Sequence, residues 1–187
     1  KKGLYCKKLF LKMCIFNKNI DFLIRRNKYF CKKNKKMTFE NLKPLVAAIV
    51  AKENTTRDEK LLAICQLLTN SIEYYNWVGY YFANHDTQTL HLGPYVGAET
   101  DHTVIPFGKG ICGQVAESNT NFVVPNVAAQ DNYIACSFTV KSEIVVPLFV
   151  NGVNIGQIDI DSHIIDPFTE KDERFLEFVN EQVAILF

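Results

Sequence analysis

A hairpin signal near the C-terminal end is the feature that most constrains the fold of this chain. Two apolar, β-branched runs, Glu143–Val150 and Val153–Asp161, are separated by the pair Asn151-Gly152. An Asn-Gly pair suits the two positive-φ positions of a tight turn, and it is the strongest short-range hairpin signal in a sequence. We therefore predict two antiparallel strands joined at this pair, and with them an antiparallel sheet.

The remaining elements follow from local patterns. Three threonines precede apolar residues at helical spacing and predict helix starts, namely Thr38, Thr56 with Glu59, and Thr169 with Asp172. Shorter patterns predict four strands, over Trp77–Phe82, Thr89–Leu92, Val104–Pro106 and Phe122–Val124. Glycine and proline predict connections at Gly93-Pro94 and Gly97. A short helix is predicted over Ile111–Glu117, and a long loop over Pro125–Thr139. This order favours an α+β fold with a central antiparallel sheet and helices grouped on one face.

Charge divides the chain into two segments. Residues 1–36 hold thirteen Lys or Arg and one acid, whereas residues 37–187 hold eight basic and nineteen acidic residues. We read residues 1–36 as a basic N-terminal extension outside the fold, such as a translated upstream region, and residues 37–187 as one domain that begins at Met37. The alternative is a basic helix that contacts anionic lipid or RNA.

Two classes of partner are disfavoured for the body, residues 37–187. An acidic surface repels nucleic acid, so we expect no nucleic-acid partner. No apolar run approaches the ~20 residues that a transmembrane helix needs, so we expect no membrane contact by the body.

Three acids gather at the open end of the predicted hairpin. Strand alternation places Val153, Ile155, Gln157, Asp159 and Asp161 on one face. Counting back from the turn brings Glu143 near the last two of these residues. Three neighbouring acids repel one another unless a cation lies among them or one holds a proton. The pattern predicts either an ammonium-binding or proton-donating pocket, or a solvated strand end.

Two cysteines are candidates for redox chemistry. Cys112 follows Gly108-Lys109-Gly110 at the start of the predicted short helix, where the helix N-terminus and the lysine both favour a thiolate. Cys136 lies on the long loop, where an exposed thiol is expected. The alternative is that Cys112 is a small core residue and Cys136 a bystander, because free cysteines are more often inert than catalytic.

Aromatic residues on the first predicted strand are candidates for a ligand wall. Trp77, the only tryptophan, with Tyr80 and Tyr81 would suit a methyl or thioether group. The alternative is that all three are core residues, which is usual for aromatic runs in strands. The four histidines show no metal-ligand spacing, so we expect neither a metal nor a cofactor.

Six segments share their order and spacing with one known family, namely Asn76–Tyr81, Leu92–Tyr95, Pro106–Gly113, Tyr133–Cys136, Ser142–Pro147 and Ile155–Ser162. Together they resemble the free methionine-(R)-sulfoxide reductases, which are single-domain GAF proteins. The resemblance covers about residues 38–185. It implies a GAF-like fold whose ligand pocket is covered by loops on the sheet face opposite the helices.

The resemblance also implies an activity and roles for residues. The activity is reduction of free methionine-(R)-sulfoxide to methionine in the cytoplasm, through a cysteine sulfenic acid and a disulfide, with thioredoxin as reductant. It leaves a homodimer open. The implied roles are nucleophile for Cys136, second cysteine for Cys112, contact with the substrate methyl for Trp77, and an acidic pocket of Glu143, Asp159 and Asp161. Beside these roles, the strand pattern makes Tyr81 a candidate for substrate binding, and a carboxylic acid with a raised pKa can donate a proton, for which Glu143 is our candidate.

One position departs from the family pattern. Many members carry a third cysteine ten residues before the one that matches Cys112, and this chain has His102 there. The departure leaves Cys112, or an external thiol, to resolve the oxidised nucleophile. The rival interpretation is a GAF module that binds a small amine or nucleotide without catalysis.

Overall fold

The computed structural model describes residues 37–132 and 139–187 of the 187-residue chain. Its elements are α3 (Phe39–Val50), α4 (Arg57–Ser71), β1 (Trp77–Asn84), β2 (Thr89–Val96), β3 (Val104–Pro106), α5 (Gly110–Ser118), β4 (Phe122–Val124), the 3-10 turn η1 (Val127–Ala129), β5 (Ser142–Val150), β6 (Val153–Ser162) and α6 (Glu170–Ala184). The predicted N-terminal extension and Cys136 lie outside the described residues, and the proposed domain boundary at Met37 stays a prediction.

The strands form one six-stranded sheet in the order β3-β2-β1-β6-β5-β4. Every neighbouring pair is antiparallel, which confirms the prediction from the Asn151-Gly152 hairpin. Both turn residues have positive φ, at 52° and 79°, as the turn requires. Strands β1 and β6 form the central pair of this sheet.

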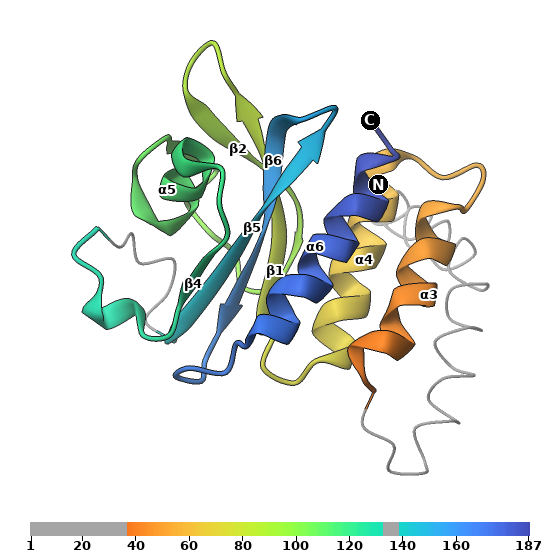
Figure 1. Cartoon of the computed structure of the whole chain (residues 1–187), viewed down its shortest axis with the longest axis horizontal. Coiled ribbons are helices and arrows are strands. Elements are labelled where there is room, and N and C mark those ends of the chain that lie inside the picture. Colours follow the sequence, from red (N-terminus) through yellow and green to blue (C-terminus); the bar gives the residue numbers. More distant parts are fainter. Residues whose placement is uncertain (1–36, 133–138) are drawn as a thin grey trace, which may run out of the picture. The chain divides into compact units, whose positions relative to one another are not determined.

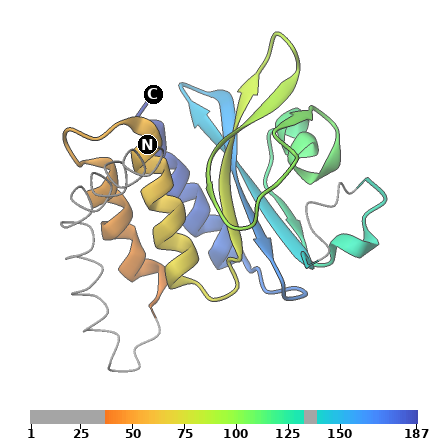
Figure 2. The ribbon, with the colours of Figure 1, turned by 180° about the vertical axis from the view of Figure 1, so that it is seen from behind.

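Helices cover the two faces of the sheet unequally. Helices α4 and α6 pack on one face with α3 outside them, and α5 packs on the other face (Figure 1). The reverse view shows the same division (Figure 2). The α+β prediction with helices on one face is confirmed, with α5 as the single helix on the pocket side of the described part.

Capping explains where the long helices begin. The Thr56 hydroxyl accepts a hydrogen bond from the Glu59 N–H, and the Glu59 carboxylate accepts one from the Thr56 N–H at 2.9 Å. Thr169 and Asp172 form the same reciprocal arrangement at the start of α6. These pairs satisfy N–H groups that have no partner inside the helix, so the predicted starts are confirmed.

Each sheet face carries its own core. Val78 and Tyr80 of β1 and Ile158 and Ile160 of β6 belong to the core beneath α3, α4 and α6. The opposite core contains Trp77 and Tyr81 with residues of α5. Alternation along β1 and β6 therefore sends even-numbered residues to the helices and odd-numbered residues toward α5. None of the described helices has the length and apolar content needed to cross a bilayer.

Strand β2 corrects one predicted connection. It continues through Gly93-Pro94 to Val96 instead of ending at Leu92. Tyr81 of β1 lies opposite Leu92, and Gly79 lies opposite Tyr95. Between these two pairs β2 has one residue more than β1, so the Gly93-Pro94 pair lies in a bulge. A bulge accepts proline because no ladder hydrogen bond is required of its missing N–H.

A second bulge corrects the predicted alternation of β6. Leu148 pairs with Gly156 and Phe149 with Asn154, which leaves Ile155 without an opposite residue. Ile155 packs against the helix-side core, contrary to the prediction that it shares a face with the aspartates. Because of this one-residue shift, Glu143 pairs with Asp161 rather than with Ile160. The bulge thus sends the Glu143 side chain to the α5 face.

Gly156 is required where this bulge meets β1. A Cβ on Gly156 would lie 2.3 Å from the Tyr81 carbonyl oxygen, which belongs to the neighbouring backbone. We expect Gly156→Ala to lower the free energy of unfolding by roughly 2–4 kcal/mol, measured by urea denaturation. The matched control is Gly152→Ala, where nothing lies within 4 Å and only the positive φ costs about 1 kcal/mol. Equal losses in the two variants would show that the close approach is not what requires glycine.

Candidate functional site

The site is built on the α5 face of the neighbouring strands β1, β6 and β5. In the β1–β6 ladder, Trp77 lies opposite Asp161 and Gly79 opposite Asp159. Glu143 of β5 lies opposite Asp161 on the other side. Since directly opposed residues share a sheet face, the ladder brings the three acids and the tryptophan together. Gly79 leaves room for the indole, because a Cβ there would lie 2.3 Å from the Trp77 ring.

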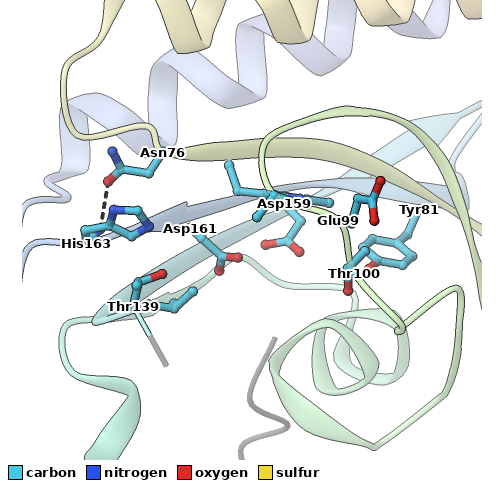
Figure 3. Close-up of a pocket in the computed structure, with 11 residues that line it drawn as sticks. Asn76, Tyr81, Glu99, Thr100, Thr139, Asp159, Asp161 and His163 are labelled. Carbon is cyan, nitrogen blue, oxygen red and sulfur yellow. Dashed lines mark hydrogen bonds between the residues drawn. The ribbon is translucent and has the colours of Figure 1, made fainter. Parts of the chain in front are cut away.

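A pocket of about 90 Å³ opens on this face. In Figure 3 the carboxyl groups of Asp159 and Asp161 point into it from β6, with Tyr81 and Thr100 on one side. The pocket is lined by Asn76, Trp77, Tyr81, Ala98, Glu99, Thr100, Thr139, Val140, Asp159, Asp161 and His163. It is therefore apolar and aromatic on one wall and acidic on its floor.

Hydrogen bonds and stacking hold the aromatic wall in place. The Trp77 Nε1–H donates to the Ala98 carbonyl at 3.1 Å, and the indole stacks on Tyr95 with ring centroids 5.3 Å apart. The Tyr81 hydroxyl donates to the His102 carbonyl at 3.0 Å. Both residues thus reach the pocket with fixed orientations. Tyr80 instead lies in the helix-side core and takes no part in this wall.

A thiol lies beside the acids. Cys112, in the first turn of α5, places its Sγ 3.3 Å from Asp159 Oδ2 and 3.9 Å from Glu143 Oε1. A small void of about 10 Å³ is lined by these three residues and, among others, by His102 and Lys109. Asp159 lines both the void and the larger pocket, so it connects the thiol to the pocket.

Burial decides the protonation of the acids. Glu143, Asp159 and Asp161 are each at most 4% exposed, so the prediction of a solvated strand end is wrong. Burial raises the pKa of Asp159 to about 7. Burial and then the neighbouring carboxylates raise the pKa values of Glu143 and Asp161 well above their usual range. The cluster therefore holds protons at neutral pH.

Two of these carboxyl groups also carry unused hydrogen-bonding capacity. Asp159 Oδ1 and Asp161 Oδ1 have no hydrogen-bond partner among the described residues. A buried oxygen without a partner is costly, so both atoms favour a ligand that brings hydrogen-bond donors or positive charge into the pocket.

The predicted site residues can now be placed. Trp77, Tyr81, Asp159 and Asp161 line the larger pocket, whereas Glu143 and Cys112 line the adjoining void. Cys136 lies outside the described residues.

Sequence reasoning missed the rest of the lining. Asn76 and His163 flank the ends of β1 and β6, and the Asn76 side chain accepts a hydrogen bond from the His163 N–H at 2.7 Å. Glu99, Thr100 and Thr139 reach the pocket from connections, where no local pattern marks a lining residue.

Comparisons with known proteins show the family of this chain. The family model for the GAF domain matches residues 54–187. GAF domain-containing protein A of Dictyostelium discoideum is 34% identical over 145 residues, which are 78% of this chain and 89% of that protein. The free methionine-R-sulfoxide reductase of Saccharomyces cerevisiae is 41% identical over 104 residues, 54% of this chain and 57% of that protein.

Among solved structures, the chain is similar to the free methionine-R-sulfoxide reductase from Neisseria meningitidis in complex with its substrate. That likeness has a TM-score of 0.75 and 34% identity, and it covers 80% of this chain and 87% of that one. The two chains therefore share a fold over nearly all of the described residues.

Proposed function

The chain belongs to the GAF domain family, in the group of free methionine-(R)-sulfoxide reductases, and from this premise we propose that it reduces free L-methionine-(R)-sulfoxide to L-methionine. The observation that carries the proposal is the buried thiol and acid cluster beside a pocket with an aromatic wall. The Neisseria meningitidis relative, whose structure contains its substrate, supports the same assignment.

Substrate recognition in this proposal divides the pocket in two. Asp159 and Asp161 bind the ammonium group of the amino acid, which supplies the charge and donors that their unpaired oxygens lack. Trp77 and Tyr81 hold the methyl end against the aromatic wall. Methionine within a polypeptide has no ammonium group at this point, so the pocket selects the free amino acid.

The first step transfers the sulfoxide oxygen to a thiolate. Cys136, outside the described residues, is the proposed nucleophile and attacks the sulfoxide sulfur. The S–O bond of the substrate breaks, methionine leaves, and Cys136 becomes a sulfenic acid. The step consumes one proton, for which Glu143 is the candidate donor because burial and neighbouring acids raise its pKa.

The second step restores the nucleophile. The Cys112 thiol condenses with the sulfenic acid, which forms a disulfide and releases water. Cys112 Sγ lies 3.3 Å from Asp159 Oδ2, and the pKa of Asp159 is about 7, so the ionised form of Asp159 can take the thiol proton and pass it to the departing hydroxide, which leaves as water. A dithiol reductant, proposed as thioredoxin in the reducing cytoplasm, then reduces the disulfide by thiol exchange.

A non-catalytic sensor is the second candidate function. It is favoured by His102, which stands where many reductases carry a third cysteine. In that case the pocket binds an amine-bearing ligand without turnover. The two functions differ in whether the sulfoxide is consumed.

Single-turnover chemistry tests the proposal. The reduced protein, without added reductant, is mixed with free methionine-(R)-sulfoxide, its S epimer and N-acetyl-methionine-(R)-sulfoxide. We expect a stoichiometric amount of methionine, with loss of two thiols, from the free R epimer alone. Binding of the free sulfoxide without methionine formation would overturn the reductase and leave the sensor.

A further inference from the structure

We propose that Cys112, Glu143 and Asp159 form a binding site for one divalent cation of intermediate softness, with Zn²⁺ as the natural example. The three ligand atoms, a thiol sulfur and two carboxyl oxygens, all lie within 4.8 Å of one another. This spacing suits a single ion at their centre, because Zn–S and Zn–O bonds are about 2.0–2.3 Å long.

The ligands converge from three separate segments of the chain. Cys112 comes from α5, Glu143 from β5 and Asp159 from β6. All three are buried, and the void between them measures about 10 Å³, close to the space that one small ion or water occupies. This separation explains why no metal-ligand spacing is visible in the linear sequence.

Two residues that line the void carry buried atoms without a partner in residues 37–132 and 139–187, and one of these atoms, Asp159 Oδ1, is the oxygen that the ammonium of the proposed substrate would also use. Asp159 is almost fully buried, yet its Oδ1 has no hydrogen-bond partner among the described residues. His102 lines the same void, and its Nδ1 is also buried without a partner in that part of the chain. None of the ion pairs between described residues involves Glu143 or Asp159. A cation would satisfy lone pairs that the described fold leaves unused.

The donor set selects the class of ion. A thiolate favours Zn²⁺ and Co²⁺ over Mg²⁺ and Ca²⁺, which need a larger shell of oxygen ligands. Binding displaces the thiol proton and the carboxyl protons, so the affinity increases with pH. Among the described residues, the other charged or titratable groups that face this cluster are Asp161, Lys109 and His102.

Occupation of this site would inhibit the proposed reductase. The ion would hold Cys112 and Asp159, which the second step needs, and this consequence rests on the proposed function. The binding site itself does not, because it can be observed without turnover.

Binding of Co²⁺ to the reduced full chain tests the proposal. Four other thiols are first replaced by serine, namely Cys6, Cys14, Cys31 and Cys136. We expect one Co²⁺ per chain and a thiolate-to-cobalt charge-transfer absorption that added Zn²⁺ removes. Cys112→Ser should abolish this absorption, and Glu143→Gln or Asp159→Asn should weaken binding about tenfold or more. The matched control, Cys65→Ser, removes a core thiol on the helix side and should change nothing.

Two results would overturn the metal site. The first is that the four-serine chain shows no charge-transfer absorption although its circular dichroism spectrum shows that it is folded. The second is that the absorption remains after Cys112→Ser. Methionine formation is measured with the unmodified chain, because the four-serine chain lacks Cys136. Methionine formation by the unmodified chain, with no cobalt absorption in the four-serine chain, would reject the metal site and keep the reductase. Cobalt absorption in the four-serine chain, with no methionine formation by the unmodified chain, would keep the metal site and reject the reductase.

Discussion

Cys136→Ser should abolish methionine formation even in the first turnover, with a loss of about 10³-fold or more, because no other thiol takes the oxygen. Cys112→Ser should keep the first turnover and lose the following ones. In this variant the sulfenic acid on Cys136 has no internal thiol with which it can condense. Rapid-quench measurement of methionine, with thiol counting, separates the two variants. Cys112→Ser should also retain a sulfenic acid that dimedone traps.

Cys65→Ser is the matched control for this pair of variants. Cys65 is buried in the core beneath the helices, and burial raises its pKa, so it is not reactive. We expect unchanged first and later turnovers. Full activity of Cys136→Ser would contradict the assigned nucleophile, and a normal steady-state rate in Cys112→Ser would assign the resolving role to an external thiol.

Asp159→Asn should stabilise the ligand-free protein at alkaline pH while it weakens substrate binding. The pKa of Asp159 rises from an ordinary 3.8 to about 7 in the fold, because the carboxyl group is buried. Between these values the folded protein keeps a proton that the unfolded chain releases. The free energy of unfolding therefore falls as pH rises through this range, and the loss is complete above about pH 7.

The size of this effect follows from the same shift. A rise of the Asp159 pKa from 3.8 to about 7 corresponds to roughly 4 kcal/mol, and relaxation of the site lowers the expected value to roughly 2–4 kcal/mol. Urea denaturation of wild type and Asp159→Asn, from about pH 4 to about pH 8, measures the effect. The free energy of unfolding of Asp159→Asn minus that of wild type should increase by roughly 2–4 kcal/mol as the pH rises over this range.

A second buried aspartate provides the control for this experiment. Asp172 is also buried, but its carboxylate accepts hydrogen bonds from Tyr74, Tyr75 and Thr169. Asp172→Asn exchanges an accepting oxygen for a donor and should destabilise the protein at both ends of the pH range. A constant difference between wild type and Asp159→Asn across the range would contradict protonation of the cluster.

Local sequence signals predicted most of the fold. The Asn151-Gly152 turn and the capping threonines act within a few residues, so their patterns can be read directly from the chain. The pairing of Glu143 with the aspartates was also anticipated in outline. It depends, however, on the bulge at Ile155, which no local pattern marked.

The remaining features depend on contacts between distant segments. Burial of Glu143, Asp159 and Asp161 beneath α5, and hence their protonation, follows from packing rather than from the carboxyl residues themselves. Pocket residues such as Glu99 and His163 lie on connections, where periodicity carries no information. The contact of Cys112 with Asp159 spans 47 residues and became visible only in the folded chain.

The central claim is that the protonated acids on the pocket floor bind the ammonium group of a free amino acid. The most direct measurement is calorimetric titration of free methionine-(R)-sulfoxide into Cys136→Ser at about pH 7, in two buffers with different ionisation enthalpies. We expect release of about one proton on binding, because the ammonium group ionises Asp159 or Asp161. Binding with no proton release, or equal binding of N-acetyl-methionine-(R)-sulfoxide, would contradict the account.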